Sequence, residues 1–254
     1  MLKSICKNFF LFIVCLQMAF FADAQNSYTT SSKVSFKMSM LATREDSLQK
    51  EFQAKGLEWP ARYVFIRSFK YDGQLEVWVK SHAKEKYKLF KTYHVCLQSG
   101  AMGPKRMQGD FQVPEGFYYI NEFNPNSNYH LALGLNYPNA SDKVLSDPLR
   151  PGNGIYIHGS CVSIGCIPVT DSDIEEIYLI ASAAKANGED FIPVHIFPVR
   201  YNKKKSLEFF ENYTRSNPSL EKFESQLRAA YDKFEATKEV PIVLIDRKGD
   251  YVID

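Results

Sequence analysis

The stretch over residues 155–178, IYIHGSCVSIGCIPVTDSDIEEIY, constrains the fold of this chain more than any other. An apolar, strand-like run ends at His158, a turn with two glycines and two cysteines follows, and a helical pattern then begins at Thr170. Thr170 and Asp173 have the spacing of a helix N-terminus, and apolar residues recur at helical spacing until Gly188. The stretch therefore predicts a strand, a tight turn and a long helix over 170–186.

Runs of β-branched and aromatic residues predict a sheet before this stretch. Residues 63–69 and 75–80 flank the turn Tyr71-Asp72-Gly73-Gln74, which predicts a hairpin. A strand over 191–199 contains two prolines, and these favour an edge position. The remaining elements that we expect are strands over 87–98, 117–121, 129–136 and 154–158, a loop over 138–152, an amphipathic helix over 220–234 and a terminal hairpin of 240–245 with 251–253. The predicted fold class is α+β and mostly β.

The N-terminus has the pattern of a secretory signal peptide. Lys3 and Lys7 precede an apolar run over 9–21 that is too short to span a bilayer comfortably, and Ala22-Asp23-Ala24 supplies a cleavage site. An uncleaved anchor is the alternative. We expect residues 1–24 to be removed and the mature protein to be exported and soluble, with no transmembrane segment.

Composition limits the class of partner. The chain has 254 residues, of which 45% are hydrophobic and 24% charged, as in an ordinary folded domain. A net charge of +2 gives no reason to expect nucleic acid or an anionic membrane as a partner. Removal of the signal peptide leaves Cys96, Cys161 and Cys166. Because their number is odd, at least one thiol is expected to be free.

Cys166 is the best candidate for a reactive thiol. A thiol attacks a carbonyl as the thiolate, so it needs a nearby base, and His158 lies at the end of the preceding strand. The N–H groups of Gly165 and Cys166 are candidates for an oxyanion hole. Ser160 and Ser163 are rival nucleophiles, but neither lies in an elbow with flanking glycines.

Three other interpretations of these side chains stay open at this point. A Cys161–Cys166 disulfide is sterically conceivable and would be inert. His158, Cys161 and Cys166 supply three zinc ligands without an obvious fourth. The third interpretation is a buried structural thiol. It fits Cys96 better than Cys166, because Cys96 lies in a predicted strand between two apolar residues.

His158-Gly159 followed by Ser163-Ile164-Gly165-Cys166 resembles the HG…SxGC signature of the L,D-transpeptidase catalytic domain, also called the YkuD domain. The short spacing between histidine and cysteine is similar to that of the YafK-type murein L,D-transpeptidase branch. Segments 65–70 with 75–78, and 103–110 with 113–118, also resemble parts of that branch. The resemblance covers roughly residues 63–199.

The resemblance implies a mostly β catalytic domain that acts on peptidoglycan stem peptides. Family members attack the amide between an L-centre, usually of meso-diaminopimelate, and a terminal D-alanine, and they pass the acyl group to an amine or to water. The resemblance implies neither a metal nor an organic cofactor. The site residues that it implies are Cys166 as nucleophile, His158 as general base, the Gly159 carbonyl as the group that orients the imidazole, Ser163 as a support of the loop, and Gly165 as part of the oxyanion hole.

Two positions depart from the usual pattern of the family. Ile164 stands where many members have histidine, and Pro168 stands where many have arginine or asparagine. Both departures fit the YafK-type branch, some members of which trim stems as L,D-carboxypeptidases or release a wall-linked outer-membrane protein. They also motivate a second hypothesis, a catalytically silent protein that binds the cell wall or acts as a scaffold there.

The resemblance places the exported protein in the periplasm or cell envelope. The predicted organisation is a signal peptide over 1–24, a flexible and helical lead-in over 25–60, the catalytic domain over 61–200 and a C-terminal α/β extension, packed on that domain, over 201–254.

Overall fold

The computed structural model describes residues 39–215 and 217–254. The predicted signal peptide and residues 25–38 of the predicted lead-in lie outside the described residues. Residues 39–54 are helical, and Gly56 follows with a φ of +65°. The chain divides into two units, 1–47 and 48–254, and every element discussed below belongs to the second. Within the described ranges, no helix has the length and apolar character needed to cross a membrane.

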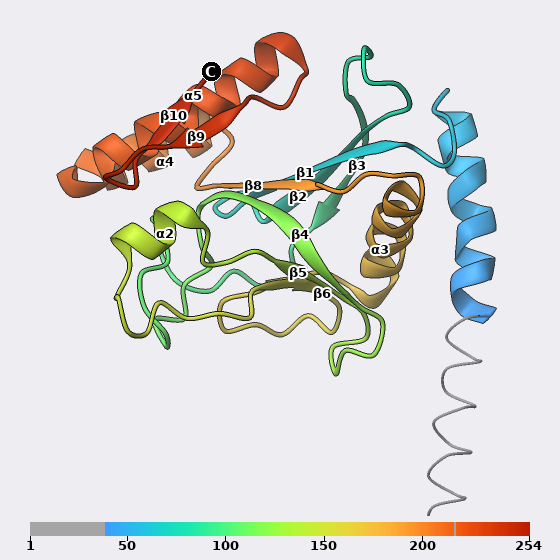
Figure 1. The fold of residues 1–254 in the computed structure, drawn as a ribbon, viewed down its shortest axis with the longest axis horizontal. Helices are drawn as coiled ribbons and strands as arrows, with labels where there is room; N and C mark the ends of the chain where they lie inside the picture. The colour runs from blue at the N-terminus through green and yellow to red at the C-terminus, as the bar shows by residue number, and fades with distance from the viewer. Residues whose placement is uncertain (1–38, 216) are drawn as a thin grey trace, which may run out of the picture. The chain divides into compact units, whose positions relative to one another are not determined.

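A mixed eight-stranded sheet forms the centre of the second unit, with α4, α5 and the β9–β10 hairpin grouped at one end and α3 at the other (Figure 1). The order across the sheet is β3-β2-β1-β8-β4-β5-β6-β7. The antiparallel pairing of β1 with β2 confirms the predicted first hairpin. The strands are β1 Tyr63–Phe69, β2 Gln74–Lys80, β3 Lys88–His94, β4 Gly116–Asn124, β5 Ala132–Leu135, β6 Tyr156–His158, β7 Ile167–Pro168 and β8 Pro193–Phe197.

The predicted edge position of β8 is wrong. The strand lies in the middle of the sheet, parallel to β1 and antiparallel to β4. Its two prolines do not interrupt the ladder because Pro193 is its first residue and Pro198 follows its last. The Pro198 carbonyl still accepts a hydrogen bond from the Tyr71 N–H at 2.8 Å. Proline lacks only the donor, so a strand bounded by prolines keeps its central ladder.

Helix α3 begins as predicted, whereas α2 corrects the prediction. The Thr170 side chain accepts from the Asp173 N–H at 3.2 Å, at the start of α3 (Asp171–Ala186). The segment 138–152 is not a loop throughout, because α2 (Ala140–Leu145) lies within it, capped by Asn139 and Asp142. The remaining elements are α4 Lys204–Arg215, the 3-10 turn η1 Pro218–Leu220, α5 Glu221–Thr237, β9 Val243–Ile245 and β10 Tyr251–Ile253. The antiparallel β9–β10 pair confirms the predicted terminal hairpin.

The C-terminal elements pack on the sheet through an aromatic core. Phe69 of β1 and Phe197 of β8 contact Tyr231 of α5, and Tyr251 of β10 belongs to the same buried cluster. Burial of such rings is the main favourable contribution to the free energy of folding at this contact. The architecture, a mixed sheet with helices against it, is the α+β class that the sequence predicted.

A buried group of charges joins α5 to the segment before β4. Lys70 Nζ lies 2.9 Å from Glu115, and both side chains are fully buried. Glu224 of α5 is also buried beside Glu115. Both Glu224 oxygens and Oε2 of Glu115 have no other hydrogen-bond partner among the described residues. Two carboxyl groups in contact need a proton between them, so burial and the neighbouring Glu115 charge raise the pKa of Glu224 to about 11.

We expect Glu224→Gln to stabilise the protein at neutral pH. The folded protein retains the Glu224 proton, whereas the unfolded chain loses it above about pH 4.3. The free energy of unfolding therefore falls as pH rises, by up to about 1.4 kcal/mol per pH unit, and glutamine removes this dependence. The variant should be roughly 2–3 kcal/mol more stable than wild type at pH 7 by urea unfolding. Glu221→Gln, an exposed change on the same helix, is the control, and equal pH slopes in the Glu224→Gln variant and wild type would contradict the expectation.

Candidate functional site

His158 is the last residue of β6, and its place is fixed by strands on both sides. It pairs with Ala132 of β5 and with Pro168 of β7, and only 2% of its surface is exposed. Nδ1 lies 2.6 Å from the Gly159 carbonyl oxygen. Burial lowers the pKa of His158, so the ring is neutral at neutral pH. Because a carbonyl can only accept, the single ring proton is on Nδ1 and Nε2 keeps its lone pair.

Tyr129 covers the imidazole, and sequence reasoning did not single it out. The two ring centroids are 4.7 Å apart. The Tyr129 carbonyl accepts from the Gly159 N–H at 3.1 Å, which joins the β4–β5 loop to the turn after β6. Gly159 allows this approach, since a Cβ there would lie 3.1 Å from the Tyr129 carbonyl oxygen and only 2.5 Å from Oδ1 of Asp171. Nothing in the sequence beyond a predicted strand start marked Tyr129.

The cysteines pair differently from the alternatives considered for the sequence. Cys96 and Cys161 form a disulfide with a Cα–Cα distance of 5.2 Å, so Cys96 is not a free structural thiol and a Cys161–Cys166 bond is excluded in this structure. The backbone at this position is also joined, because the Cys96 N–H donates to the Pro168 carbonyl at 2.9 Å. Cys166 is the cysteine that stays free in the part of the chain that the structure describes.

The disulfide also bears on the zinc hypothesis, because Cys161 has no thiolate to offer while it is bonded to Cys96. Across residues 39–215 and 217–254, no three histidine, cysteine or acidic side chains are grouped so that they could hold a metal ion.

Ser163 organises the turn that carries Cys166. Its Oγ accepts from the Gly165 N–H at 3.1 Å and the Cys166 N–H at 2.7 Å, and it donates to the Cys166 carbonyl at 2.8 Å. The predicted oxyanion-hole donors are therefore directed at Ser163 in this structure. Gly165 has a φ of +137°, and a Cβ there would press against the Gln112 carbonyl at 3.3 Å, so the turn requires glycine.

The Cys166 thiol is half-buried and protonated at rest. Burial raises its pKa, although the Tyr156 N–H and the charge of Lys105 act in the opposite direction. Sγ donates to the Gly154 carbonyl at 3.6 Å, and no hydrogen bond joins it to His158 among the described residues. A thiol in this state needs a base at the moment of reaction.

Two hollows meet at Cys166. The larger, of about 410 Å³, also contains His158 and Tyr129 and has a rim of amide side chains from the β4–β5 loop. The smaller, of about 220 Å³, extends toward Lys105. The larger hollow is lined by Asn124, Asn126, Ser127, Asn128, Tyr129, Ala132, Gly154, Tyr156, His158, Ile164 and Cys166.

This arrangement can support nucleophilic catalysis. The free thiol and a neutral imidazole with an available Nε2 line one solvent-open hollow of the size typical of ligand sites. Hydrogen bonds between a base and a nucleophile are often formed only when substrate is bound, so the bond to Gly154 is compatible with transfer of the thiol proton to His158.

Comparison with known proteins agrees with the geometry. The L,D-transpeptidase catalytic domain (YkuD) matches residues 76–196. YafK of Escherichia coli (strain K12), a candidate L,D-transpeptidase, is 36% identical over 192 residues, which cover 75% of this chain and 73% of YafK. Among solved structures, the helical cell shape determining protein Pgp2 from Campylobacter jejuni is similar at 21% identity and a TM-score of 0.44, over 72% of this chain and 73% of Pgp2. The match to YafK and the domain match together show that this chain belongs to the L,D-transpeptidase family.

Proposed function

We propose that the protein is an exported acyltransferase or hydrolase that acts on peptidoglycan stem peptides, with Cys166 as nucleophile and His158 as general base. One observation carries the proposal: Cys166, the free thiol, lines the same hollow as a neutral His158 whose Nδ1 is bound to the Gly159 carbonyl. Family membership supplies the substrate class, and the region that we assign to catalysis is 61–200.

These two side chains carry the covalent step and the proton transfers of the proposed reaction. Nε2 of His158 takes the proton from the thiol, and Sγ attacks the amide carbonyl of the stem peptide to form a C–S bond. The C–N bond breaks, and the leaving amine takes the proton from the imidazolium. Water or an acceptor amine then attacks the thioester carbonyl and gives up a proton to His158. The C–S bond breaks, and the imidazolium returns the proton to Sγ, which regenerates the thiol. The Gly159 carbonyl holds the ring with Nε2 toward the thiol throughout.

The oxyanion that forms on the attacked carbonyl needs donors. The N–H groups of Gly165 and Cys166 are the nearest pair in sequence, and both now donate to Ser163 Oγ. To stabilise the oxyanion, at least one of these N–H groups has to break its hydrogen bond to the Ser163 hydroxyl. The role proposed for Ser163 is thus to hold the turn in shape until substrate arrives.

Export and the periplasmic location rest on residues 1–24 and gain support from the disulfide. Disulfides persist in oxidising compartments such as the periplasm and are rare in the cytosol. The Cys96–Cys161 bond is therefore consistent with a mature protein that works outside the cytoplasm. Proposed partners are stem peptides and, for the variant that releases protein, a wall-linked outer-membrane protein.

The test is incubation of the mature protein with tetrapeptide and pentapeptide muropeptides, followed by mass spectrometry of products and of intact protein. We expect a shortened or crosslinked stem and a transient adduct on Cys166. Alkylation with iodoacetamide should stop turnover, whereas a chelator should not. Turnover that resists alkylation but is lost with the chelator would reject the thiol mechanism.

A silent wall-binding protein is the second candidate. The specific observation in its favour is that the Cys166 thiol is hydrogen-bonded to Gly154 and both backbone donors are hydrogen-bonded to Ser163, so each of these groups already has a partner within the protein. Under this hypothesis muropeptides bind without any covalent adduct. Intact mass after incubation separates the two hypotheses, because binding alone leaves the mass unchanged.

A further inference from the structure

The two hollows that meet at Cys166 differ in charge. The larger is lined by neutral amide, hydroxyl and aromatic groups and by a neutral His158. The smaller is lined by Lys105 and otherwise by glutamine, asparagine, glycine and apolar residues. A peptide attacked at Cys166 extends in both directions from the scissile bond. A peptide that fills both hollows would therefore have one of its two sides beside the Lys105 cation.

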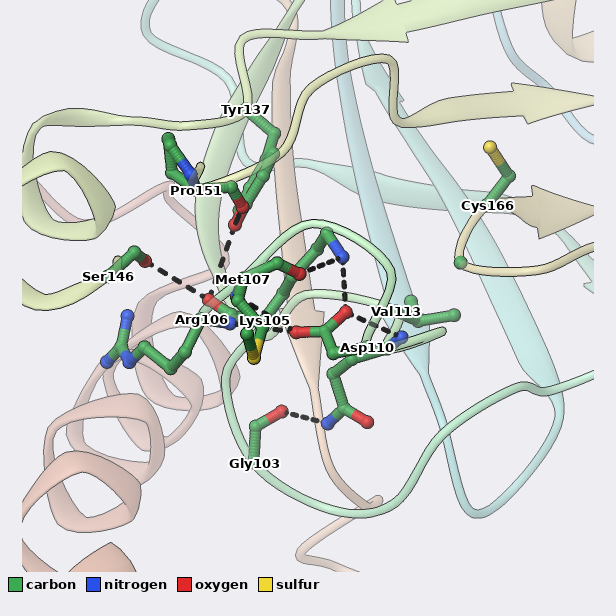
Figure 2. Close-up of polar contacts among 12 residues, drawn as sticks. Gly103, Lys105, Arg106, Met107, Asp110, Val113, Tyr137, Ser146, Pro151 and Cys166 are labelled. Atoms are coloured by element: carbon green, nitrogen blue, oxygen red, sulfur yellow. Dashed lines mark hydrogen bonds and ion pairs between the residues drawn. The ribbon is translucent and has the colours of Figure 1, made fainter. Parts of the chain in front are cut away.

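The Lys105 ammonium group is held in place by hydrogen bonds that leave part of its donor capacity available. Its side chain is 7% exposed, and Nζ donates to the Met107 carbonyl at 2.9 Å and to Asp110, which leaves one of three N–H donors without a partner among the described residues (Figure 2). The buried position fixes the ammonium group beside the hollow, so binding of an anion there would cost little side-chain entropy.

Asp110 forms an ion pair with Lys105, but its carboxylate also accepts hydrogen bonds from several backbone N–H groups, which weakens its screening of the ammonium charge. Besides Lys105, it accepts from the N–H groups of Arg106, Met107 and Gln112 at 3.1 Å each. Burial would raise the pKa of Asp110, but the hydrogen bond from Lys105 and then those from the three N–H groups lower it, so the group stays ionised as the centre of the turn. The positive charge of Lys105 also lowers the pKa of Cys166, and its field therefore reaches the thiol.

We propose that the smaller hollow is a carboxylate subsite in which Lys105 pairs with a free carboxylate of the substrate next to the scissile bond. The inference rests on the proposed function and adds a specificity determinant to it. A compact hollow of about 220 Å³ with a lysine in its wall fits the carboxylate of a single amino acid better than a long uncharged chain. Peptides with this carboxylate blocked should be poor substrates.

Two carboxylates of a stem peptide lie close enough to the scissile amide to fill this subsite. One is the α-carboxylate of the terminal D-alanine, which departs with the amine. The other is the free carboxylate of diaminopimelate, which stays with the acyl group. Three synthetic substrates separate them: the tetrapeptide, its C-terminal carboxamide, and the tetrapeptide with L-lysine in place of diaminopimelate.

In the wild type, we expect kcat/KM to fall about 10–100-fold for whichever substrate lacks the bound carboxylate, since a hydrogen bond to a charged group is lost. In Lys105→Gln, kcat/KM for the unmodified tetrapeptide should fall by the same factor. The substrate that lacks the bound carboxylate should show little further loss in this variant. Lys105→Arg should restore part of the preference. Lys86→Gln, which removes an exposed lysine paired with Glu239, should leave the preference unchanged.

If Lys105→Gln lowers kcat/KM equally for all three substrates, the inference is overturned and the proposed function still stands. If wild type turns over none of the peptides, protection of Cys166 from iodoacetamide decides instead. The tetrapeptide should then slow alkylation in wild type and fail to do so in Lys105→Gln, and equal protection in both would overturn the subsite. Thermal unfolding of each variant identifies any that has lost its fold.

Discussion

Replacing Cys166 with alanine is expected to abolish the acyl-enzyme and to lower kcat/KM on the preferred muropeptide by about 10³–10⁶-fold. The reason is that two other candidate nucleophiles of this turn, Cys161 and Ser163, are both engaged in bonds of their own. Cys161 is tied to Cys96, and the Ser163 hydroxyl is bonded to three backbone groups of its own turn. The expected loss applies to kcat, because the hollows that bind the peptide stay intact.

The measurement combines single-turnover kinetics with intact mass. Wild type should gain the mass of an acyl group, and Cys166→Ala should gain none while still binding the peptide. Val162→Ala changes an exposed residue of the same turn and is the matched control, with activity near that of wild type. A covalent adduct on Cys166→Ala, or turnover within tenfold of wild type, would mean that another residue is the nucleophile.

The local parts of the site were predictable from the sequence because they lie within a few residues of each other. The strand that ends at His158, the glycine turn and the helix that begins at Thr170 all follow from side-chain types and spacing. The bond from the His158 ring to Gly159 joins adjacent residues, so it is local as well. What spacing did not reveal is that Ser163 already occupies the N–H groups of the turn.

Contacts between distant segments were not predictable in the same way. Tyr129 reaches His158, and Lys105 reaches the hollow at Cys166, only because β4, β5 and β6 lie side by side in the sheet. The central position of β8 also depends on a pairing with β1, a strand far earlier in the chain. Hydrophobic patterning gives the faces of a strand but not its neighbours. The prolines at the ends of β8 suggested an edge strand, whereas the position of a strand in a sheet depends on its pairing partners.

The cysteine pairing shows the same limit most clearly. Cys161 and Cys166 are close in sequence, which made them the natural candidates for a bond. Cys161 instead bonds to Cys96, 65 residues away, at the point where the Cys96 N–H meets the Pro168 carbonyl. The end of β3 and the turn after β6 are thus joined by one backbone hydrogen bond and one covalent bond. With Cys161 in this bond, Cys166 is left as a free thiol.

Removal of this bond should cause a large loss of stability. The disulfide closes a loop of 65 residues, and the loop-closure entropy that it removes from the unfolded chain corresponds to about 4 kcal/mol. Cys96→Ala/Cys161→Ala should therefore lower the free energy of unfolding by roughly 3–4 kcal/mol and the Tm by roughly 10 °C. Urea and thermal unfolding with and without a phosphine reductant measure both quantities.

The comparison is cleanest in a Cys166→Ala background, where no free thiol can exchange with the disulfide. There, reductant should lower the stability of the otherwise native protein to that of the triple variant and should leave the triple variant unchanged. Protein made in the reducing cytosol should match the reduced form, and protein exported to the periplasm should match the oxidised one. Because the bond fixes the start of the turn that ends at Cys166, the Cys96→Ala/Cys161→Ala variant, which keeps Cys166, should also be alkylated at Cys166 at a rate different from that of wild type. Equal unfolding midpoints with and without reductant would show that the backbone contacts alone hold the turn.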